Sequence, residues 1–203
     1  MKALVTGFEP FGGEPVNPAQ RAVEGLATRL GDIEIITQIL PVSFARALPL
    51  LEAAILETAP AIVLCLGEAG GRCELSLERV AINLDDARIP DNDGRQPIDC
   101  PVTAGGPAAY FASLPVKAAA AALCDAGLPA VVSHSAGTFV CNHVFYGLLQ
   151  FAATCRPAPL CGFLHLPYLP EQAARHPGMP SMALADILRG IAVVLRIAAD
   201  ALA

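Results

Sequence analysis

The sequence predicts an α/β fold, a three-layer α/β/α sandwich with a mostly parallel twisted central sheet. Short apolar or β-branched runs alternate with segments whose apolar residues recur at helical spacing. The helical segments have roughly the length of the crossovers that join parallel strands, about 10–15 residues. The 203 residues contain no repeat and no low-complexity linker. We therefore expect a single domain that spans residues 1–203.

The expected strands are short and are bounded by glycine, proline or polar residues. The run IEIITQIL is rich in β-branched residues, and AIVLCL is fully apolar, as is typical of strands buried on both faces. The carboxyl ends of such strands are where open α/β sheets place their ligands. The predicted strands are residues 2–7, 33–40, 61–66, 75–84, 130–135 and 161–166.

The expected helices lie between these strands. Asn17 is suited to be an N-cap and Pro18 the first helical residue that follows it. A second helix places Ala47, Leu51 and Ile55 on one face. The predicted helices are residues 17–30, 44–58, 114–126, 141–153 and 181–202. Residues 85–110 are rich in Asp, Pro and Gly, and an irregular segment of this length is uncommon unless it is functional.

Charge and apolar content exclude several classes of protein. The net charge is −6 and there is no basic run, so binding to nucleic acid or to an anionic membrane has no electrostatic support. The mean hydropathy is +0.52, yet no apolar run approaches the roughly 18 residues of a spanning helix. The chain has no P-loop, strand-linked GxGxxG or CxxC pair, so we expect no nucleotide cofactor and no metal.

The first residues and the cysteines indicate a compartment. Residues 1–7 contain one cation and a brief apolar stretch that is typical of a strand, without a signal-peptide cleavage site. The seven cysteines are an odd number without a regular framework, which is typical of free thiols in a reducing compartment. We therefore expect a cytoplasmic protein.

Cys141 is the cysteine best placed to be a nucleophile. It falls in the first turn of a predicted helix that follows a strand. Unpaired backbone N–H groups and the helix dipole favour a thiolate there, and the same donors can hold an oxyanion. From position alone, a buried structural cysteine is the open alternative. The other cysteines lie in predicted core strands, near helix ends or in loops without an activating group: Cys65, Cys161, Cys124, Cys155, Cys73 and Cys100.

A cysteine nucleophile needs a base that also serves as the leaving-group acid, normally a histidine. His165 ends the predicted strand CGFLHL, and His134 ends its own strand, which makes it the rival base. His143 lies two residues after Cys141, so the two side chains point apart on a helix. His176 lies in a proline-rich loop, where we expect it to be solvated. The sequence thus favours His165 and keeps His134 open.

The base needs a group that orients it. Strand alternation in LSLERVAINL places Glu78 on one face with Val80 and Ile82. A carboxylate on an apolar face is costly unless it is paired. An imidazole N–H would pair with it and would hold the base in one orientation. A buried ion pair with Arg72 or Arg88 is the alternative that the sequence leaves open.

Three phenylalanines bracket the candidate nucleophile. Phe8 and Phe11 follow the first strand directly, and Phe139 lies two residues before Cys141. Rings at strand ends could wall a flat, uncharged ligand ring, and ordinary loop packing is the alternative.

Longer motifs connect these residues. They are LVTGFEPFGG followed by NP, then AGGR, LERVAINLDDARIPDN, QPID, LPVKA, SAGTFVCNHVFYGLL and GFLHLPYLPEQ, in that order. From end to end the sequence resembles the pyroglutamyl peptidase I (pyrrolidone-carboxylate peptidase) family of cysteine peptidases. The resemblance implies an omega-peptidase that hydrolyses the amide bond after an N-terminal pyroglutamyl residue of peptides, through a thioester. It also points to a homodimer or a homotetramer.

The resemblance assigns roles to residues of these motifs. It implies a catalytic triad of Cys141, His165 and Glu78. It implies that Asn17 supports a loop or contacts the ring, that Arg88 lies close to the nucleophile and that Asp91 anchors its loop. The implied hydrophobic pocket for the pyrrolidone ring consists of Phe8, Phe11, Ile89, Phe139 and Val140.

The sequence departs from the family pattern at two positions. The pattern before AGGR is usually Gly-Gln-Ala-Gly-Gly-Arg, and this chain has Glu68 in place of the glutamine. A carboxylate oxygen can still accept the lactam N–H, but it adds charge beside a neutral ligand. His134 is the second departure, and we assign it no role.

Two other functions compete with a cysteine peptidase. One is a non-catalytic binder of cyclic amides, which would not need Cys141, His165 and Glu78 together. The other is a metal-dependent hydrolase that uses Cys141, His143, His134 or His165, but their spacings match no zinc signature.

Overall fold

The central strands of the main sheet have side chains that are buried on both faces, and its outer strands are partly exposed. The computed structural model describes residues 1–203, and its seven-stranded sheet has the order β2-β3-β1-β4-β9-β5-β8. Neighbours from β3 to β9 are parallel, as are β5 and β8, whereas β2–β3 and β5–β9 are antiparallel. The strands are β1 (Lys2–Phe8), β2 (Arg29–Leu30), β3 (Ile33–Leu40), β4 (Ile62–Glu68), β5 (Leu75–Glu78), β8 (Ala130–Ser133) and β9 (Leu160–Leu166).

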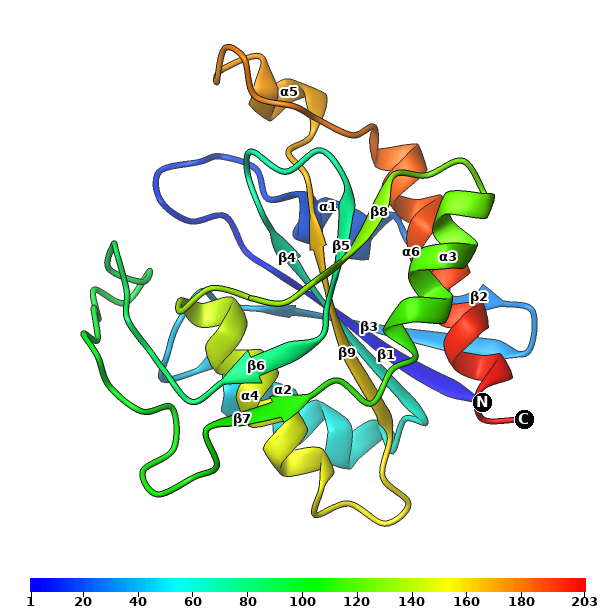
Figure 1. The fold of residues 1–203 in the computed structure, drawn as a ribbon, viewed down its shortest axis with the longest axis horizontal. Coiled ribbons are helices and arrows are strands. Elements are labelled where there is room, and N and C mark those ends of the chain that lie inside the picture. The colour runs from blue at the N-terminus through cyan, green and yellow to red at the C-terminus, as the bar shows by residue number, and fades with distance from the viewer.

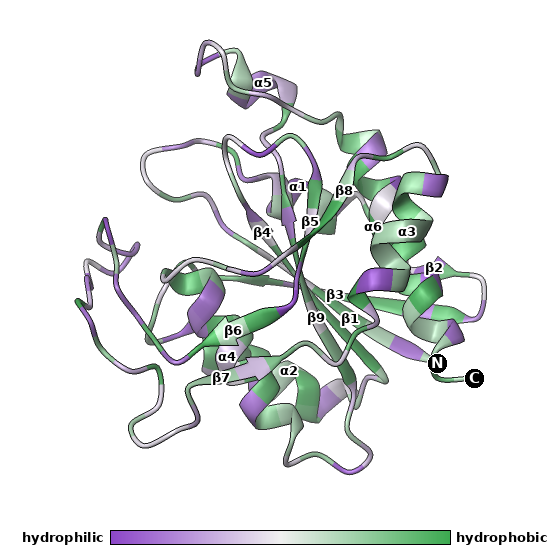
Figure 2. Ribbon diagram, in the orientation of Figure 1, coloured by the Kyte–Doolittle hydropathy of each residue, from purple (hydrophilic) through white to green (hydrophobic).

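Helices cover both faces of this sheet (Figure 1). Strand alternation sends Ala3 and Val5 of β1 into one apolar core and Leu4 and Phe8 into the other. The first core includes α1 (Pro18–Gly25), α3 (Val116–Asp125) and α6 (Leu184–Asp200). The second includes α2 (Ala47–Thr58) and α4 (Val140–Ala152). The predicted three-layer sandwich is therefore confirmed, and the hydrophobic colours of Figure 2 gather on the crossing strands and their helices.

The predicted strand 75–84 is wrong as a single element. It splits into β5 and β6 (Val80–Ile82), and β6 leaves the main sheet to pair with β7 (Ala109–Phe111). The side chain of Asn142 on α4 causes the departure, because its oxygen accepts from Ile82 N and its nitrogen donates to the carbonyls of Ile82 and Leu84. The alternation of apolar residues within 75–84 does not indicate that Asn142 competes for these hydrogen bonds.

The first and the last predicted helices are the ones that are shortened most. The first starts as predicted, with the Asn17 side chain accepting from Ala19 N, but ends at Gly25, because Leu26 is extended and the chain then forms β2. The last helix spans Leu184–Asp200, because Ser181 forms a bridge with Tyr168 instead of starting it. A short helix, α5 (Pro170–Ala173), follows β9.

The segment 85–110 is mostly irregular, as expected, and is tied to the rest of the molecule at fixed points. Asp91, which is buried, accepts hydrogen bonds from Phe44 N and Arg95 N, so it anchors the loop. Asp86 N donates to Thr138 O, just before α4. No helix of the structure is long and apolar enough to cross a membrane.

Candidate active site

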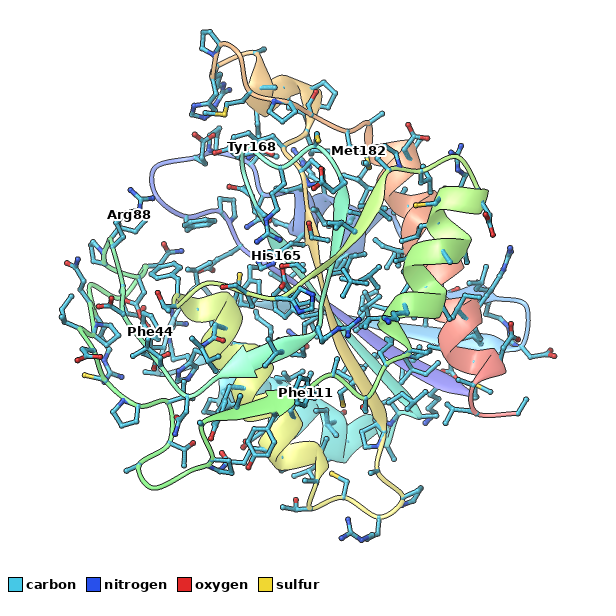
Figure 3. All side chains as sticks on the ribbon, in the orientation of Figure 1. Phe44, Arg88, Phe111, His165, Tyr168 and Met182 are labelled. Atoms are coloured by element: carbon cyan, nitrogen blue, oxygen red, sulfur yellow. The ribbon has the colours of Figure 1, made fainter.

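A histidine and a glutamate meet inside the sheet, where antiparallel β5 and β9 lie side by side. Ser76 is opposite His165, and Glu78 lies two residues further along β5 on the same face. His165 Nδ1 lies 2.8 Å from Glu78 Oε1. Both side chains are buried, with exposed fractions of 5% and 0%. Figure 3 shows His165 near the centre of the molecule.

Arg72 completes this buried pair. Its Nη1 lies 2.8 Å from Glu78 Oε1, and its Nη2 donates to Ser135 O. Both partners that the sequence left open for Glu78, an imidazole and an arginine, are therefore present together. The arginine is Arg72 and not Arg88, which is exposed and forms no ion pair.

The charges of this cluster set the tautomer of the histidine. Burial opposes ionisation of Glu78, but His165, Ser133 and Arg72 outweigh it and hold the pKa of Glu78 below its usual value. Burial lowers the pKa of His165, although Glu78 opposes the change. An ionised carboxylate only accepts hydrogen bonds, so neutral His165 donates from Nδ1 and keeps Nε2 as a free base.

Cys141 lies directly above the neighbouring strand. A Cβ atom built on Gly67 of β4 would be 2.9 Å from Cys141 Sγ and 2.8 Å from the Phe163 ring. Gly67 is the register partner of His165 across the β4–β9 pair. The thiol therefore sits beside the strand position of His165, and Gly67 is needed because a side chain would displace the sulfur.

The start of α4 supplies unpaired donors next to the sulfur. Cys141 is the second residue of this helix, and no side chain caps its first turn. The first hydrogen bond of the helix runs from His143 N to Phe139 O. The N–H groups of Val140, Cys141 and Asn142 precede it and have no intrahelical acceptor.

The thiol of Cys141 is held in its neutral form. Burial, together with the charges of Glu68, Glu78 and Cys65, raises the pKa of Cys141 to about 12, and Arg72 only partly offsets this. The expectation that the helix start lowers this pKa is therefore wrong for the unliganded site. Because both His165 and Cys141 are neutral, the thiol has to lose its proton to a base before or during attack on a substrate.

A small pocket opens beside the sulfur. The empty space between the side chains there is about 230 Å³, and this figure includes open solvent. It brings together six of the eight residues that the sequence proposed for substrate contact, with Cys141 itself. Val42 is the addition that the sequence did not indicate. The lining residues are Phe8, Phe11, Asn17, Val42, Glu68, Phe139, Val140 and Cys141.

Aromatic contacts hold the apolar wall of this pocket. Phe11 and Phe139 lie 6.0 Å apart between ring centroids, and Phe44 meets Phe139 edge-on at 5.4 Å. Ile89 does not line the pocket but lies against the same loop, 3.6 Å from a Cβ built on Gly12. Its role stays a prediction.

Asn17 and Arg88 occupy different surroundings from each other. Asn17 donates from Nδ2 to Glu9 O and accepts from Ala19 N, so both ends of its amide support the loop and the helix start. Arg88 lies on the outer part of the irregular segment, away from His165 in Figure 3. Its proposed closeness to the nucleophile finds no contact in the structure.

The other histidines have separate partners or none. His134 is exposed and has no hydrogen bond, so Glu78 pairs with His165 and not with this rival. His143 Nδ1 lies 2.8 Å from Asp85 Oδ2, and His176 Nε2 lies 2.7 Å from Glu14 Oε1. No three His, Cys, Asp or Glu side chains are grouped so that they could hold a metal ion.

The sequence did not indicate Gln172, although it contacts the pocket. This buried side chain on α5 donates from Nε2 to Glu68 Oε2 at 2.8 Å. Its place in the motif GFLHLPYLPEQ, directly after the histidine strand, was the available indication. Burial raises the pKa of Glu68 to about 7, with Gln172 opposing the change, Glu14 adding to it and His176 opposing it.

A family model described as pyroglutamyl peptidase matches residues 1–201. The chain belongs to this family. A pyrrolidone-carboxylate peptidase of Erwinia tasmaniensis is 54% identical over 197 residues, which cover 97% of this chain and 92% of the relative. One of Gloeobacter violaceus is 52% identical over 198 residues, which cover 97% of this chain and 96% of the relative.

Solved structures agree with the family assignment. Pyroglutamyl peptidase I of Bacillus amyloliquefaciens has a TM-score of 0.94 and 44% identity, covering 98% of this chain and 94% of its own. Pyrrolidone carboxyl peptidase of Pyrococcus furiosus has a TM-score of 0.97 and 41% identity, and the match covers 100% of both chains. The resemblance that the sequence motifs indicated is confirmed.

Proposed function

We propose that this chain is a cysteine omega-peptidase that removes pyroglutamate from the N-terminus of peptides, with Cys141 as nucleophile, His165 as base and acid, and Glu78 as orienter. The observation that carries the proposal is the position of Cys141 Sγ. The sulfur lies at once over Gly67, the register partner of His165, at the uncapped start of α4 and in the wall of the apolar pocket. A binder of cyclic amides needs only the pocket.

The pocket suits a pyrrolidone ring. The ring is small, flat and uncharged, and the apolar rings of Phe8, Phe11 and Phe139 line the pocket that would receive it. Glu68 is the polar side chain of the wall with an oxygen left for the ring, because the Asn17 amide is used in the loop. The ring N–H would donate to Glu68, which places the exocyclic carbonyl of the pyroglutamyl residue toward the sulfur.

The reaction would proceed in two halves. Cys141 Sγ bonds to the exocyclic carbonyl carbon while its proton passes to His165 Nε2, and the N–H groups at the start of α4 hold the oxyanion. His165 then returns the proton to the leaving amine as the C–N bond breaks. In the second half, water attacks the thioester, His165 takes its proton, and pyroglutamate leaves as Cys141 recovers its thiol.

Ionised Glu78 stabilises the imidazolium that forms in each half. Because Arg72 already neutralises the carboxylate in the resting site, the cluster has no unpaired charge before substrate arrives. The remaining assignments are less direct. We propose that Ile89, which lies against Gly12 of the loop that carries Phe11, and its neighbour Arg88 contact the substrate.

The test is release of the amine from a pyroglutamyl amide by wild type and by Cys141→Ser. We expect wild type to release pyroglutamate and the variant to lose at least about 10³-fold in kcat, since an alcohol beside a neutral imidazole is a far weaker nucleophile. Iodoacetamide should abolish activity and a chelator should not. Wild-type rates for Cys141→Ser, or loss of activity with the chelator alone, would contradict the proposal.

Three further proposals concern the whole molecule. We infer a single catalytic domain over residues 1–203 that works in the cytoplasm, where its free cysteines stay reduced. We also infer self-association into a homodimer or homotetramer, because large apolar side chains such as Phe111 and Leu56 are 73% and 71% exposed. Light scattering on the purified protein gives the mass, and a monomer at micromolar concentration would rule the assembly out.

A further inference from the structure

Gln172 is a buried polar side chain that the reaction steps above do not use. It is 1% exposed and lies on α5, which follows the histidine strand. Its amide makes three hydrogen bonds. Oε1 accepts from Leu169 N at 3.1 Å, and Nε2 donates to Val16 O at 3.2 Å and to Glu68 Oε2 at 2.8 Å. The side chain thus joins three segments that are far apart in the sequence.

The two backbone partners fix which way the amide of Gln172 points. A backbone N–H can only donate and a backbone carbonyl can only accept. The amide oxygen therefore has to face Leu169 and the amide nitrogen has to face Val16. The one remaining amide hydrogen points at residue 68, so that position must offer an acceptor to α5.

This arrangement separates the two oxygens of Glu68. Oε2 is taken by Gln172, whereas Oε1 has no hydrogen-bond partner in the protein, and the side chain lines the pocket beside Cys141. We propose that Gln172 is a positioning residue that sets the polarity of the ring pocket, holding Glu68 Oε2 so that Oε1 is the acceptor for the ring N–H. This inference rests on the proposed function, because it assumes a ligand with an amide N–H.

The surroundings of Glu68 make its protonation matter. Glu14, in the loop after β1, and His176, in the segment after α5, face it as a hydrogen-bonded pair. Tyr168 stacks on His176, and Cys141 also lines the pocket. When Glu68 is neutral, its proton belongs on Oε1, because Oε2 accepts from Gln172. Protonated Oε1 is then a donor that faces the ring N–H, which is also a donor. Ionised Glu68 is therefore the form that matches the ring.

The first experiment compares steady-state kinetics of Gln172→Met with wild type on a pyroglutamyl amide. The substitution keeps the length of the side chain and removes its donor. We expect KM to rise about tenfold while kcat stays within about twofold, because removing one buried donor weakens binding by about that factor. Gln150→Met is the matched control. Gln150 lies at the far end of α4 and its side chain only accepts a hydrogen bond from Thr103, so the KM of this variant should equal that of wild type.

A second pair of variants tests the direction of the hydrogen bond. Gln172→Glu keeps an acceptor for the backbone N–H of Leu169 but places a carboxylate against Glu68. We therefore expect a larger rise in KM than for Gln172→Met. Adding Glu68→Gln supplies a donor toward position 172 and should recover part of that loss. Equal KM values for the single and the double variant would contradict the assigned polarity.

The third readout does not depend on activity. The ¹³C-carboxyl signal of Glu68, identified by its absence in Glu68→Gln, reports the pKa of this group by NMR titration. We expect the pKa to rise in Gln172→Met, because a donor to the ionised form is lost. An unchanged pKa and an unchanged KM, in a variant that melts like wild type, would overturn the inference. Failure of wild type to cleave the amide would overturn the proposed function instead, while the titration still tests the coupling of Gln172 to Glu68.

Discussion

The triad and the ring pocket share the sulfur of Cys141 but are held by different means. His165 and Glu78 project from paired strands, so the register of β5 against β9 sets their separation. The pocket is lined by residues of loops, strand ends and the start of α4, and its polar contact depends on Gln172, whose partners lie 104 and 156 positions away in the sequence. Backbone pairing thus sets the reaction geometry, whereas side-chain contacts between distant segments set what the pocket recognises.

Glu78→Gln should cause the largest loss of activity, because it disrupts the pair of Glu78 and His165 on β5 and β9. The amide can present a hydrogen to His165 Nδ1, which favours the wrong tautomer, and it leaves Arg72 without its charge partner. Loss of an orienting carboxylate costs about 10⁴-fold in kcat where this has been measured in serine peptidases. We expect a drop of about 10³–10⁴ in kcat with a small change in KM. Glu24→Gln, an exposed carboxylate paired with Arg21, is the control and should keep full activity.

Gly67→Ala tests whether the backbone itself positions the sulfur. The added Cβ would overlap the Phe163 ring and Cys141 Sγ, so the sulfur has to move away from His165. A displacement of about 1 Å costs roughly 10²-fold in rate. Gly25→Ala is the control, because its Cβ would meet only the flexible end of Leu188. Activity of Gly67→Ala close to that of wild type would mean that the sulfur is not constrained by β4.

The pH dependence separates the effect of the triad from that of the ring pocket. In the proposed mechanism neutral His165 is the base, so kcat should be constant above the pKa of His165 and fall tenfold per pH unit below it. Because burial lowers that pKa, this loss should begin below the usual histidine value of about 6.5. In the pocket, ionised Glu68 accepts the ring, so 1/KM should fall as the pH drops through about 7. Glu68→Gln should lose the fall in 1/KM and keep the fall in kcat. Steady-state kinetics measured at a series of pH values resolve the two effects.

Asn17→Ala should give the smallest effect. It removes the N-cap of α1 and the tie to Glu9 O, at a cost of about 1 kcal/mol. For a chain of this length we expect the melting temperature to fall by roughly 2–4 °C, with kcat unchanged and KM raised slightly. Gln20→Ala on the exposed side of the same helix is the control. A fall in kcat for Asn17→Ala would show that the pocket and the triad are coupled.

The sequence could single out Cys141 and His165 as candidates because each begins or ends an element that has a clear pattern, whereas Glu78 was singled out as a carboxylate on an apolar strand face. Cys141 starts a helix, and His165 ends an apolar strand. The pairing of Glu78 with Arg72 rather than Arg88 could not be predicted, because both arginines flank the strand and only the fold brings one of them inside. The raised pKa of Cys141 was missed for a similar reason. The helix start is local, whereas burial comes from layers packed above and below the sulfur.

Most residues that line the pocket could be predicted from the sequence, but the side chain that holds Glu68 could not. Phe8, Phe11 and Phe139 follow or precede elements with recognisable patterns. Gln172 ends the motif GFLHLPYLPEQ, but its contact with Glu68 depends on the carbonyl of Val16, which no local pattern places near α5. The end of β5 was missed because Asn142, far along the chain, takes the hydrogen bonds of Ile82.

The place of β9 has a consequence for the order of events during synthesis. This strand lies between β4 and β5 in the sheet, yet it leaves the ribosome long after both. Glu78 and His165 are 87 positions apart, which corresponds to about 4–17 s of translation at roughly 5–20 residues per second. Until then the nascent chain exposes the edges of β4 and β5, which are sites of mispairing. The strand that closes the sheet also carries His165, the proposed base, so a nascent chain that ends before β9 lacks it.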